Sequence, residues 1–275
     1  MKRLILSILL LWPAAAWGFD SAGELLDRLA ADRFAPDALE AVYEFEYPSG
    51  GGDPAGGIAE KTLVRETVFY RAPDRIRLNL TWPDREEVFL AANLSTLVMV
   101  GDQATDTPWP QPFLFYRLLL EPDPHKVRGL FESFDVDLAT FSPGQDAPVF
   151  IVGAGPGETS RPQAWFDRET LDLVRLILPA RGGRTGYDLT ASDYHRHEPG
   201  VPWPDRLEVR TTAGPALTLV LKSLRVNPTI EQEDFDLEEI KKTVAPPPEQ
   251  GAGSDLWPEL NALKKQLEWF QKKLE

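Results

Sequence analysis

The chain contains no cysteine, only three histidines and two methionines among 275 residues, and far fewer basic than acidic side chains. The absence of cysteine excludes a disulfide framework, a thiolate metal site, a cysteine nucleophile and a lipid-modified N-terminal cysteine. The formal net charge is −14 at neutral pH, and such a surface repels nucleic-acid phosphates and anionic lipid headgroups. Nucleic acid is therefore not an expected partner.

Long hydrophobic runs are also absent, and a short one lies near the N-terminus. Two basic residues precede an apolar run over residues 4–12, which is too short to cross a bilayer as a stable helix. Pro13 ends the run, and Ala16 and Gly18 supply the small side chains that a signal peptidase requires. We predict a cleavable signal peptide over residues 1–18, whose removal lowers the net charge by two, to −16, and a periplasmic mature protein. An uncleaved anchor is the alternative.

The remaining chain alternates apolar and polar side chains over many short segments, a pattern typical of half-buried strands. Leu39 and Tyr43 face one way, for example, while Glu40 and Glu44 face the other. The connections are too short for crossover helices, so the sheet should be antiparallel. We expect strands over residues 39–47, 63–70, 75–82, 88–91, 96–100, 149–152, 164–167, 171–178, 186–194, 207–212 and 217–226.

Helical signals occur in two regions. Ser21 and Glu24 have capping-box spacing, and Asp123 followed by Pro124 is typical of a helix start. We expect helices over residues 21–33, 112–120 and 124–134. A sheet of about ten or eleven strands curls, and these helices are the elements available to cover its concave face. The predicted fold class is therefore mainly β with helices (α+β), an open or half β-barrel with a helical lid.

The C-terminal part of the chain has a different composition. Residues 242–254, with three consecutive prolines and two glycines, predict a flexible linker that ends a domain spanning residues 19–241. Residues 255–275 predict an amphipathic, coiled-coil-like helix. Its apolar positions recur in steps of three and four: Leu260, Leu263, Leu267, Phe270 and Leu274. Partner docking or self-association through this helix is one interpretation, and a tail folded back onto its own domain is the other.

Motifs that carry chemistry are weak. The glycine-rich residues 152–157 follow a strand, but no helix opens after them, so we expect a hairpin turn rather than a phosphate site. His195 and His197, close to Asp193, lack a clear third ligand for zinc. The acidic stretch over residues 231–239 has no calcium-loop spacing and should form a solvated edge. We therefore expect no enzyme, no metal and no cofactor.

Apolar surface is the remaining candidate for function. The residues singled out lie on one strand face and two helix faces: Ile76, Leu78, Leu80, Trp82, Phe113, Val127, Leu130, Phe131 and Phe134. Periodicity is compatible with a filled core or with a cavity for an acyl chain. A sixteen-carbon chain contributes roughly 12 kcal/mol gross, at about 0.8 kcal/mol for each buried CH₂. Ordering and association costs of about 4–15 kcal/mol oppose this gain, so binding would be reversible.

Four segments, in this order, carry a family resemblance: residues 71–78 (RAPDRIRL), 98–102 (VMVGD), 164–171 (AWFDRETL) and 226–235 (VNPTIEQEDF). Together they resemble the LolA/LolB-like superfamily of periplasmic lipoprotein carriers over about residues 20–240. The resemblance implies an unclosed barrel, a helical lid over a hydrophobic cavity, and binding rather than catalysis.

One position departs from this family pattern. In the lipoprotein carriers a basic residue directly precedes the proline and helps to hold the lid, whereas here Ala72 precedes Pro73 and Arg71 lies one place earlier. Alternation predicts that Arg71 points to the opposite face of the sheet. The resemblance implies a carrier or chaperone for a lipid or an acylated lipoprotein. The alternative is an RseB-like regulatory protein that binds a membrane-anchored partner through its C-terminal helix.

Overall fold

One open antiparallel sheet of thirteen strands dominates the computed structural model, which describes residues 19–49, 60–92, 95–100, 103–106, 111–145, 147–180, 185–197, 200–212 and 214–243. The strands are β1 (Ala38–Ser49), β2 (Glu60–Arg71), β3 (Arg75–Thr81), β4 (Glu86–Ala92), β5 (Ser95–Val100), β6 (Gln103–Asp106), β7 (Phe141–Pro143), β8 (Val149–Val152), β9 (Gln163–Asp167), β10 (Leu173–Leu178), β11 (Tyr187–His197), β12 (Val201–Thr211) and β13 (Leu217–Val226). The predicted signal peptide and C-terminal helix lie outside these described residues.

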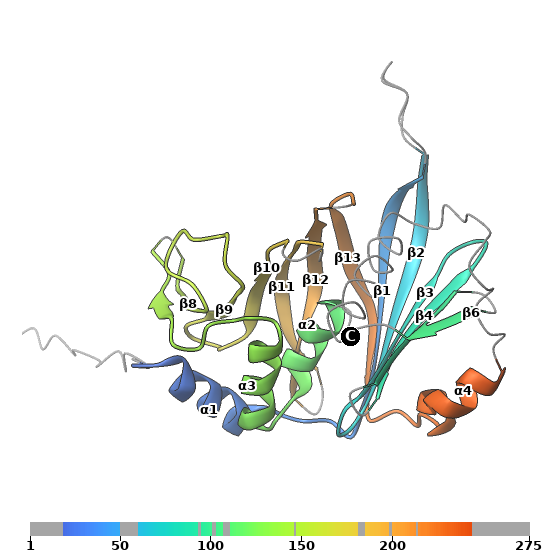
Figure 1. Cartoon of the computed structure of the whole chain (residues 1–275), viewed down its shortest axis with the longest axis horizontal. Helices are drawn as coiled ribbons and strands as arrows, with labels where there is room; N and C mark the ends of the chain where they lie inside the picture. The colour runs from blue at the N-terminus through green and yellow to red at the C-terminus, as the bar shows by residue number, and fades with distance from the viewer. Residues whose placement is uncertain are drawn as a thin grey trace, which may run out of the picture.

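The order of the strands explains why helices cross the sheet. From the central strand β1 the chain builds outwards to the edge strand β6, and it later returns from the opposite edge strand, β7, to β13 beside β1. Helices α2 (Gln111–Leu120) and α3 (Pro124–Ser133) form the connection between the two edges. Figure 1 shows the sheet curving around α2, with α3 and α1 (Ala22–Asp32) beside it. We call this covered side of the sheet the concave face.

The helices begin at the signals that the sequence contains. The Ser21 hydroxyl accepts a hydrogen bond from the Glu24 backbone N–H at 3.2 Å and caps α1. The Asp123 carboxylate likewise accepts from the His125 N–H at 2.9 Å, with Pro124 in the first turn of α3. Arg128 of α3 then binds Asp27 of α1 at 2.6 Å and joins the two helices. The three predicted helices are thus confirmed.

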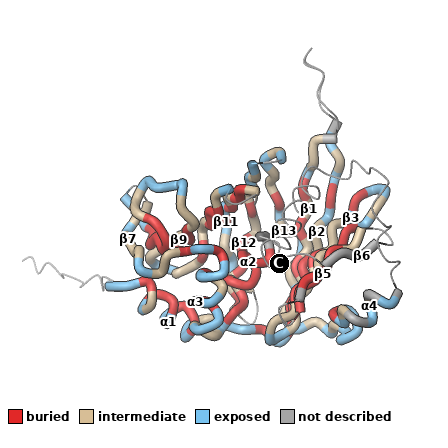
Figure 2. Tube along the Cα trace, viewed as in Figure 1, coloured by how far each residue is buried: buried red, intermediate tan, exposed pale blue. Residues whose placement is uncertain are grey.

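The main core lies between the concave face and the helices. In β1 the side chains of Leu39, Ala41 and Tyr43 are fully buried, whereas Glu40 and Glu44, at alternate positions, are only partly covered. The neighbouring strands show a similar alternation, and their buried residues, red in Figure 2, belong to the same core. The open half-barrel with a helical lid, which the alternation predicted, is therefore confirmed.

Part of the opposite, convex face is also covered. A 3₁₀ turn (Glu233–Phe235) and α4 (Leu237–Thr243) pack against β3, β4 and β5, with Phe235 buried beside Leu90 and Leu97. The acidic residues of this stretch that the structure describes are exposed, as predicted. The apolar side chains between them were not predicted to pack, because few such residues occur in this short, strongly charged segment.

The strand count exceeds the expectation through the two edge strands, β6 and β7, which contain four and three residues. Segments this short have too few residues to show an alternation. The β11–β12 hairpin is also longer than expected, since β11 extends to His197 and β12 begins at Val201. None of the described helices is long and apolar enough to cross a membrane.

Candidate ligand-binding face

The nine apolar residues singled out from the sequence lie together in the core between the concave face and the helices. Ile76, Phe113 and Phe131 are fully buried, and Leu80 and Leu130 are partly buried against the same cluster. The structure therefore assembles the predicted residues into one apolar surface. Whether that surface receives a ligand stays a prediction.

Helix α2 itself occupies this surface. Its side chains are buried on every side of the helix, including Phe115 and Leu118. A helix that is apolar all round belongs in a core, and here it lies along the concave face rather than at its rim (Figure 1). Any ligand of this face would have to take the place of α2 side chains.

A carboxyl interrupts the apolar row that β2 contributes to the concave face. Glu66 lies between Val64 and Val68, and it is directly opposite Tyr43 of β1 and Leu80 of β3. Burial raises its pKa to about 7, while the hydrogen bond from Tyr116 acts in the opposite direction. Among the described residues, no lysine or arginine pairs with Glu66. Glu66 is partly rather than fully buried, and its carboxyl ionises less readily near neutral pH than that of an exposed glutamate.

Aromatic side chains with polar atoms surround Glu66. The Tyr116 hydroxyl, from α2, donates a hydrogen bond to the Glu66 carboxylate. The Tyr116 ring stacks on Trp203 of β12, with ring centroids 6.1 Å apart, and the Tyr43 hydroxyl donates to the Pro204 carbonyl at 2.8 Å. Burial raises the pKa values of Tyr43 and Tyr116 well above that of an exposed tyrosine, so both phenols stay neutral.

The C-terminal end of α2 is fastened by a buried ion pair. Arg117 binds Glu121 one turn later, and both side chains are almost fully buried. Arg117 also donates to the Pro73 carbonyl at 3.1 Å, at the turn between β2 and β3. Arg33, which follows α1, donates to the Glu121 carbonyl at 2.8 Å. These contacts connect α2 to the sheet and to the segment after α1.

Arg71 takes no part in this connection, as the alternation predicted. Its guanidinium donates to the Ile230 carbonyl at 3.0 Å, on the convex side where Ile230 packs with α4. The basic residue that reaches the proline turn is Arg117, which comes from the helix rather than from the turn. The sequence reading did not single out Arg117.

A second carboxyl of the concave face has a cation partner. Glu87 of β4 lies directly opposite Leu80, is buried, and accepts a hydrogen bond from Arg85 at 2.9 Å. The Arg85 guanidinium also lies over the Trp82 ring, 4.2 Å from its centroid. Glu66 and Glu87 thus differ in the charge that each has beside it.

The sequence reading missed the polar residues of this site. Apolar neighbours surround Glu66, Tyr116 and Trp203 in the sequence, so these three residues were not predicted as part of the site. A signal for Glu66 was present, because the alternation of β2 places a carboxyl in the middle of the row Val64, Val68 and Tyr70. A signal for the buried Arg117 and its partner was their i, i+4 spacing, which runs from α2 to the residue directly after it.

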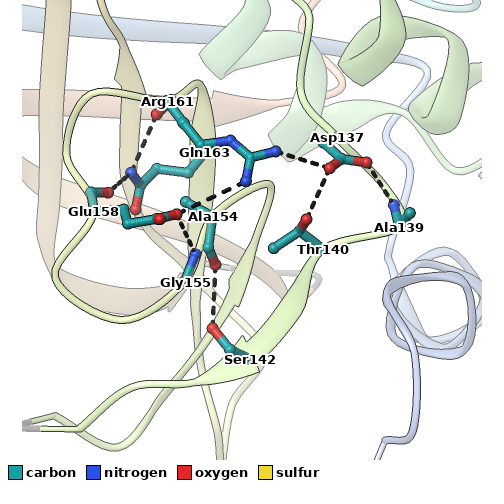
Figure 3. Close-up of polar contacts among 9 residues, drawn as sticks. All are labelled: Asp137, Ala139, Thr140, Ser142, Ala154, Gly155, Glu158, Arg161 and Gln163. Atoms are coloured by element: carbon teal, nitrogen blue, oxygen red, sulfur yellow. Dashed lines mark hydrogen bonds and ion pairs between the residues drawn. The ribbon is translucent and has the colours of Figure 1, made fainter.

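The glycine-rich loop after β8 is the hairpin connection that the sequence predicted. It joins β8 to β9, which pair directly. Its Gly155 backbone N–H donates to the Glu158 carboxylate at 2.9 Å, so the loop supplies its own anion. Figure 3 shows Arg161 bridging this loop to Asp137, at 2.8 Å, and Gln163 bonding back into the loop. The loop is held by contacts within itself and by the ion pair between Arg161 and Asp137.

The histidine pair lies beside the carboxylate of Asp205 rather than that of Asp193. His195 Nδ1 lies 2.8 Å from Asp205 of β12, and His197 Nε2 lies 3.6 Å from the other oxygen of that carboxylate. Asp193 contributes its backbone carbonyl to His195 instead. Across the part of the chain that the structure describes, no group of three or more His, Asp or Glu side chains is arranged to hold a metal ion.

Comparisons with known proteins point to one fold. No protein-family model and no curated protein sequence matches the chain. A solved structure of a putative outer membrane lipoprotein-sorting protein domain from Vibrio parahaemolyticus is similar over 80% of this chain and 97% of that one, with a TM-score of 0.53 and 11% identity. A LolA superfamily protein from Nitrosomonas europaea covers 80% and 99%, with a TM-score of 0.50 and 13% identity.

A third similar structure is that of a DUF1329 family protein from Desulfovibrio piger, with a TM-score of 0.51, 12% identity, and coverage of 80% of this chain and 97% of that one. Because the sequence identities are low, these similarities establish the fold alone. The chain has a LolA-like fold, an open antiparallel half-barrel whose concave face is covered by helices.

Proposed function

We propose that this protein is an exported, periplasmic carrier or chaperone that binds the acyl part of a lipid or lipoprotein against its concave face. The observation that carries the proposal is α2, a helix that is buried on all sides yet joins two sheet edges as part of a connection. An acyl chain and the apolar side chains of α2 are chemically equivalent occupants of the same surface.

The energetics favour exchange over permanent binding. A sixteen-carbon chain gains roughly 12 kcal/mol from burial, which is comparable to association costs of about 4–15 kcal/mol. A ligand that also displaces Phe115 and Leu118 must replace the burial of those side chains. Reversible loading, as a carrier requires, is the expected outcome.

The fastening of α2 fits such an exchange. The polar contacts between α2 and the sheet include the bond from Tyr116 to Glu66 and the bond from Arg117 to the Pro73 carbonyl. Both attachments involve side chains of the helix, so α2 can leave the concave face without breaking the hydrogen-bond ladder of the sheet. The signal peptide predicted over residues 1–18 supports export, and the LolA-like fold of the described residues supports binding without catalysis.

Native mass spectrometry with lipid extraction, on mature protein purified from the periplasm, tests this function. Leu80→Glu places a charge on the concave face and should abolish co-purification of lipid or acylated protein. Leu63→Glu is the matched control, because Leu63 lies on the opposite face of the neighbouring strand with 58% of its surface exposed. A folded protein that never carries an acyl ligand, in wild-type or control form, would contradict the proposal.

The regulatory alternative depends on residues 255–275, which lie outside the described residues. It is tested with a chain that ends after α4 at residue 243, because Leu237 and Ile240 of α4 pack against the sheet. A carrier should keep its ligand in this shortened form. Loss of a membrane-anchored protein partner, with no ligand bound in either form, would favour the regulatory function.

A further inference from the structure

Glu66 and Trp203 form a pair of polar groups beneath α2 that the exchange of a plain hydrocarbon chain does not explain. The Glu66 carboxyl lies in the apolar row of β2, without a lysine or arginine partner in the described part of the chain. The Trp203 side chain is fully buried, and its indole N–H makes no hydrogen bond of acceptable geometry, although the Tyr43 hydroxyl is near.

Tyr116 covers both groups in the present structure. Its hydroxyl donates to Glu66 while its ring stacks on Trp203 at 6.1 Å. When α2 leaves the concave face, Tyr116 leaves with it, so the Glu66 carboxyl and one face of the Trp203 ring are uncovered together. The carboxyl then lacks a donor in an apolar environment, where an unpaired charge is costly.

We propose that Glu66 selects ligands whose acyl chain is attached to an amine-bearing polar group, and that it disfavours ligands with an anionic group in that place. An ammonium group supplies both the donor and the positive charge that Glu66 lacks, and a neighbouring ester or amide oxygen of the ligand accepts from Trp203. This inference rests on the proposed carrier function and specifies the ligand class of the same face.

Charge across the molecule agrees with this preference. The chain carries a net charge of −14, and the second concave carboxyl, Glu87, is already neutralised by Arg85 at 2.9 Å. A ligand with a carboxylate head would therefore meet Glu66 without a compensating cation. An ammonium head would form a charge-assisted hydrogen bond, which is stronger than a bond between neutral groups.

Binding of three amphiphiles that share a twelve-carbon chain tests the inference: an alkylammonium, a primary alcohol and a carboxylate. Calorimetry below the micelle concentration, at pH 8, should give an affinity for the ammonium at least about tenfold above that for the carboxylate, with the alcohol between them. Glu66→Gln, which can still accept from Tyr116, should reduce this ratio to within about threefold. Glu44→Gln, which removes the same charge from the convex face, should leave the ratio unchanged.

A second variant separates the selection of the ligand's head group from the release of α2. Tyr116→Phe keeps the stacked ring but removes the hydrogen bond that must break when α2 leaves, so it should raise the affinity for all three amphiphiles by a similar factor, about several-fold, and keep their order. A changed order of the three affinities in Tyr116→Phe would show that Tyr116 stays beside the bound head group, and it would overturn the inference.

The outcomes distinguish the two proposals. If wild type binds none of the three amphiphiles, the carrier function fails. If wild type binds all three and Glu66→Gln leaves the ratio of the ammonium affinity to the carboxylate affinity unchanged, the carrier function stands and the selection by Glu66 is wrong.

Discussion

Carboxylates on the two faces of β1 and β2 have different partners. On the convex face Glu44 pairs with Arg65 at 3.1 Å, and Glu46 pairs with Lys61 at 2.6 Å, both in contact with solvent. On the concave face the partner of Glu66 is a phenol, and no cation pairs with it among the residues that the structure describes. The comparison teaches that charge on the convex face is ordinary surface pairing, whereas charge on the concave face is scarce and placed where a helix covers it.

The largest difference between the faces should appear in stability. Phe115→Ala removes a fully buried ring from α2 and should lower the free energy of unfolding by about 3–5 kcal/mol. Leu63→Ala on the convex face, where most of the side chain is exposed, should change it by less than about 0.5 kcal/mol. Urea denaturation of both variants measures this, and equal effects would mean that α2 does not pack on the concave face.

Removing the buried ion pair of α2 should have the next largest effect. Arg117→Ala leaves Glu121 buried without its cation and frees the Pro73 carbonyl, at a cost of about 3 kcal/mol. Hydrogen exchange should show faster exchange in α2 than in β1 and β2. Uniform acceleration across the sheet would show instead that Arg117 supports the whole fold rather than the helix.

The pH dependence of stability should distinguish Glu66 from carboxylates of the convex face. Its raised pKa means that the folded form keeps a proton that the unfolded chain releases, so the contribution of Glu66 to stability is fully present below pH 4.5 and is lost as pH rises through about 7. The phenols that face it, Tyr43, Tyr116 and Tyr187, have pKa values raised by burial and remain neutral in this window.

Glu66→Gln should remove this fall and gain about 1–3 kcal/mol relative to wild type at pH 8. Thermal unfolding at pH 5 and pH 8 measures the difference, with Glu44→Gln as control. A wild-type protein whose stability does not fall over this range would show that Glu66 is solvated.

The smallest effect should come from a convex ion pair. Arg225 binds Glu40 on neighbouring strands, with 63% of the arginine side chain exposed. Arg225→Ala should cost less than about 0.5 kcal/mol, and added salt should remove the difference. A larger, salt-independent loss would mean that this pair is structural and would weaken the contrast between the faces.

Much of the fold could be predicted because alternation and capping are local signals. Leu39, Ala41 and Tyr43 mark the inner face of β1, and Ser21 and Asp123 mark helix starts without any knowledge of the partners. The apolar members of the candidate face followed from the same alternation. Its polar members did not, because Glu66, Tyr116 and Trp203 are separated by tens of residues and come together through the crossing of α2.

The sequence alone determined which side chains face inwards, where helices begin, and that Arg71 turns away from the concave face. Each of these depends on a local signal within one element, either the periodicity of side chains or a capping residue. The tertiary structure decided that β1 pairs with β13, that α2 fills the concave face, and that Glu66 meets a phenol rather than a cation. Those facts depend on contacts between distant segments, and distance in space is set by packing rather than by spacing along the chain.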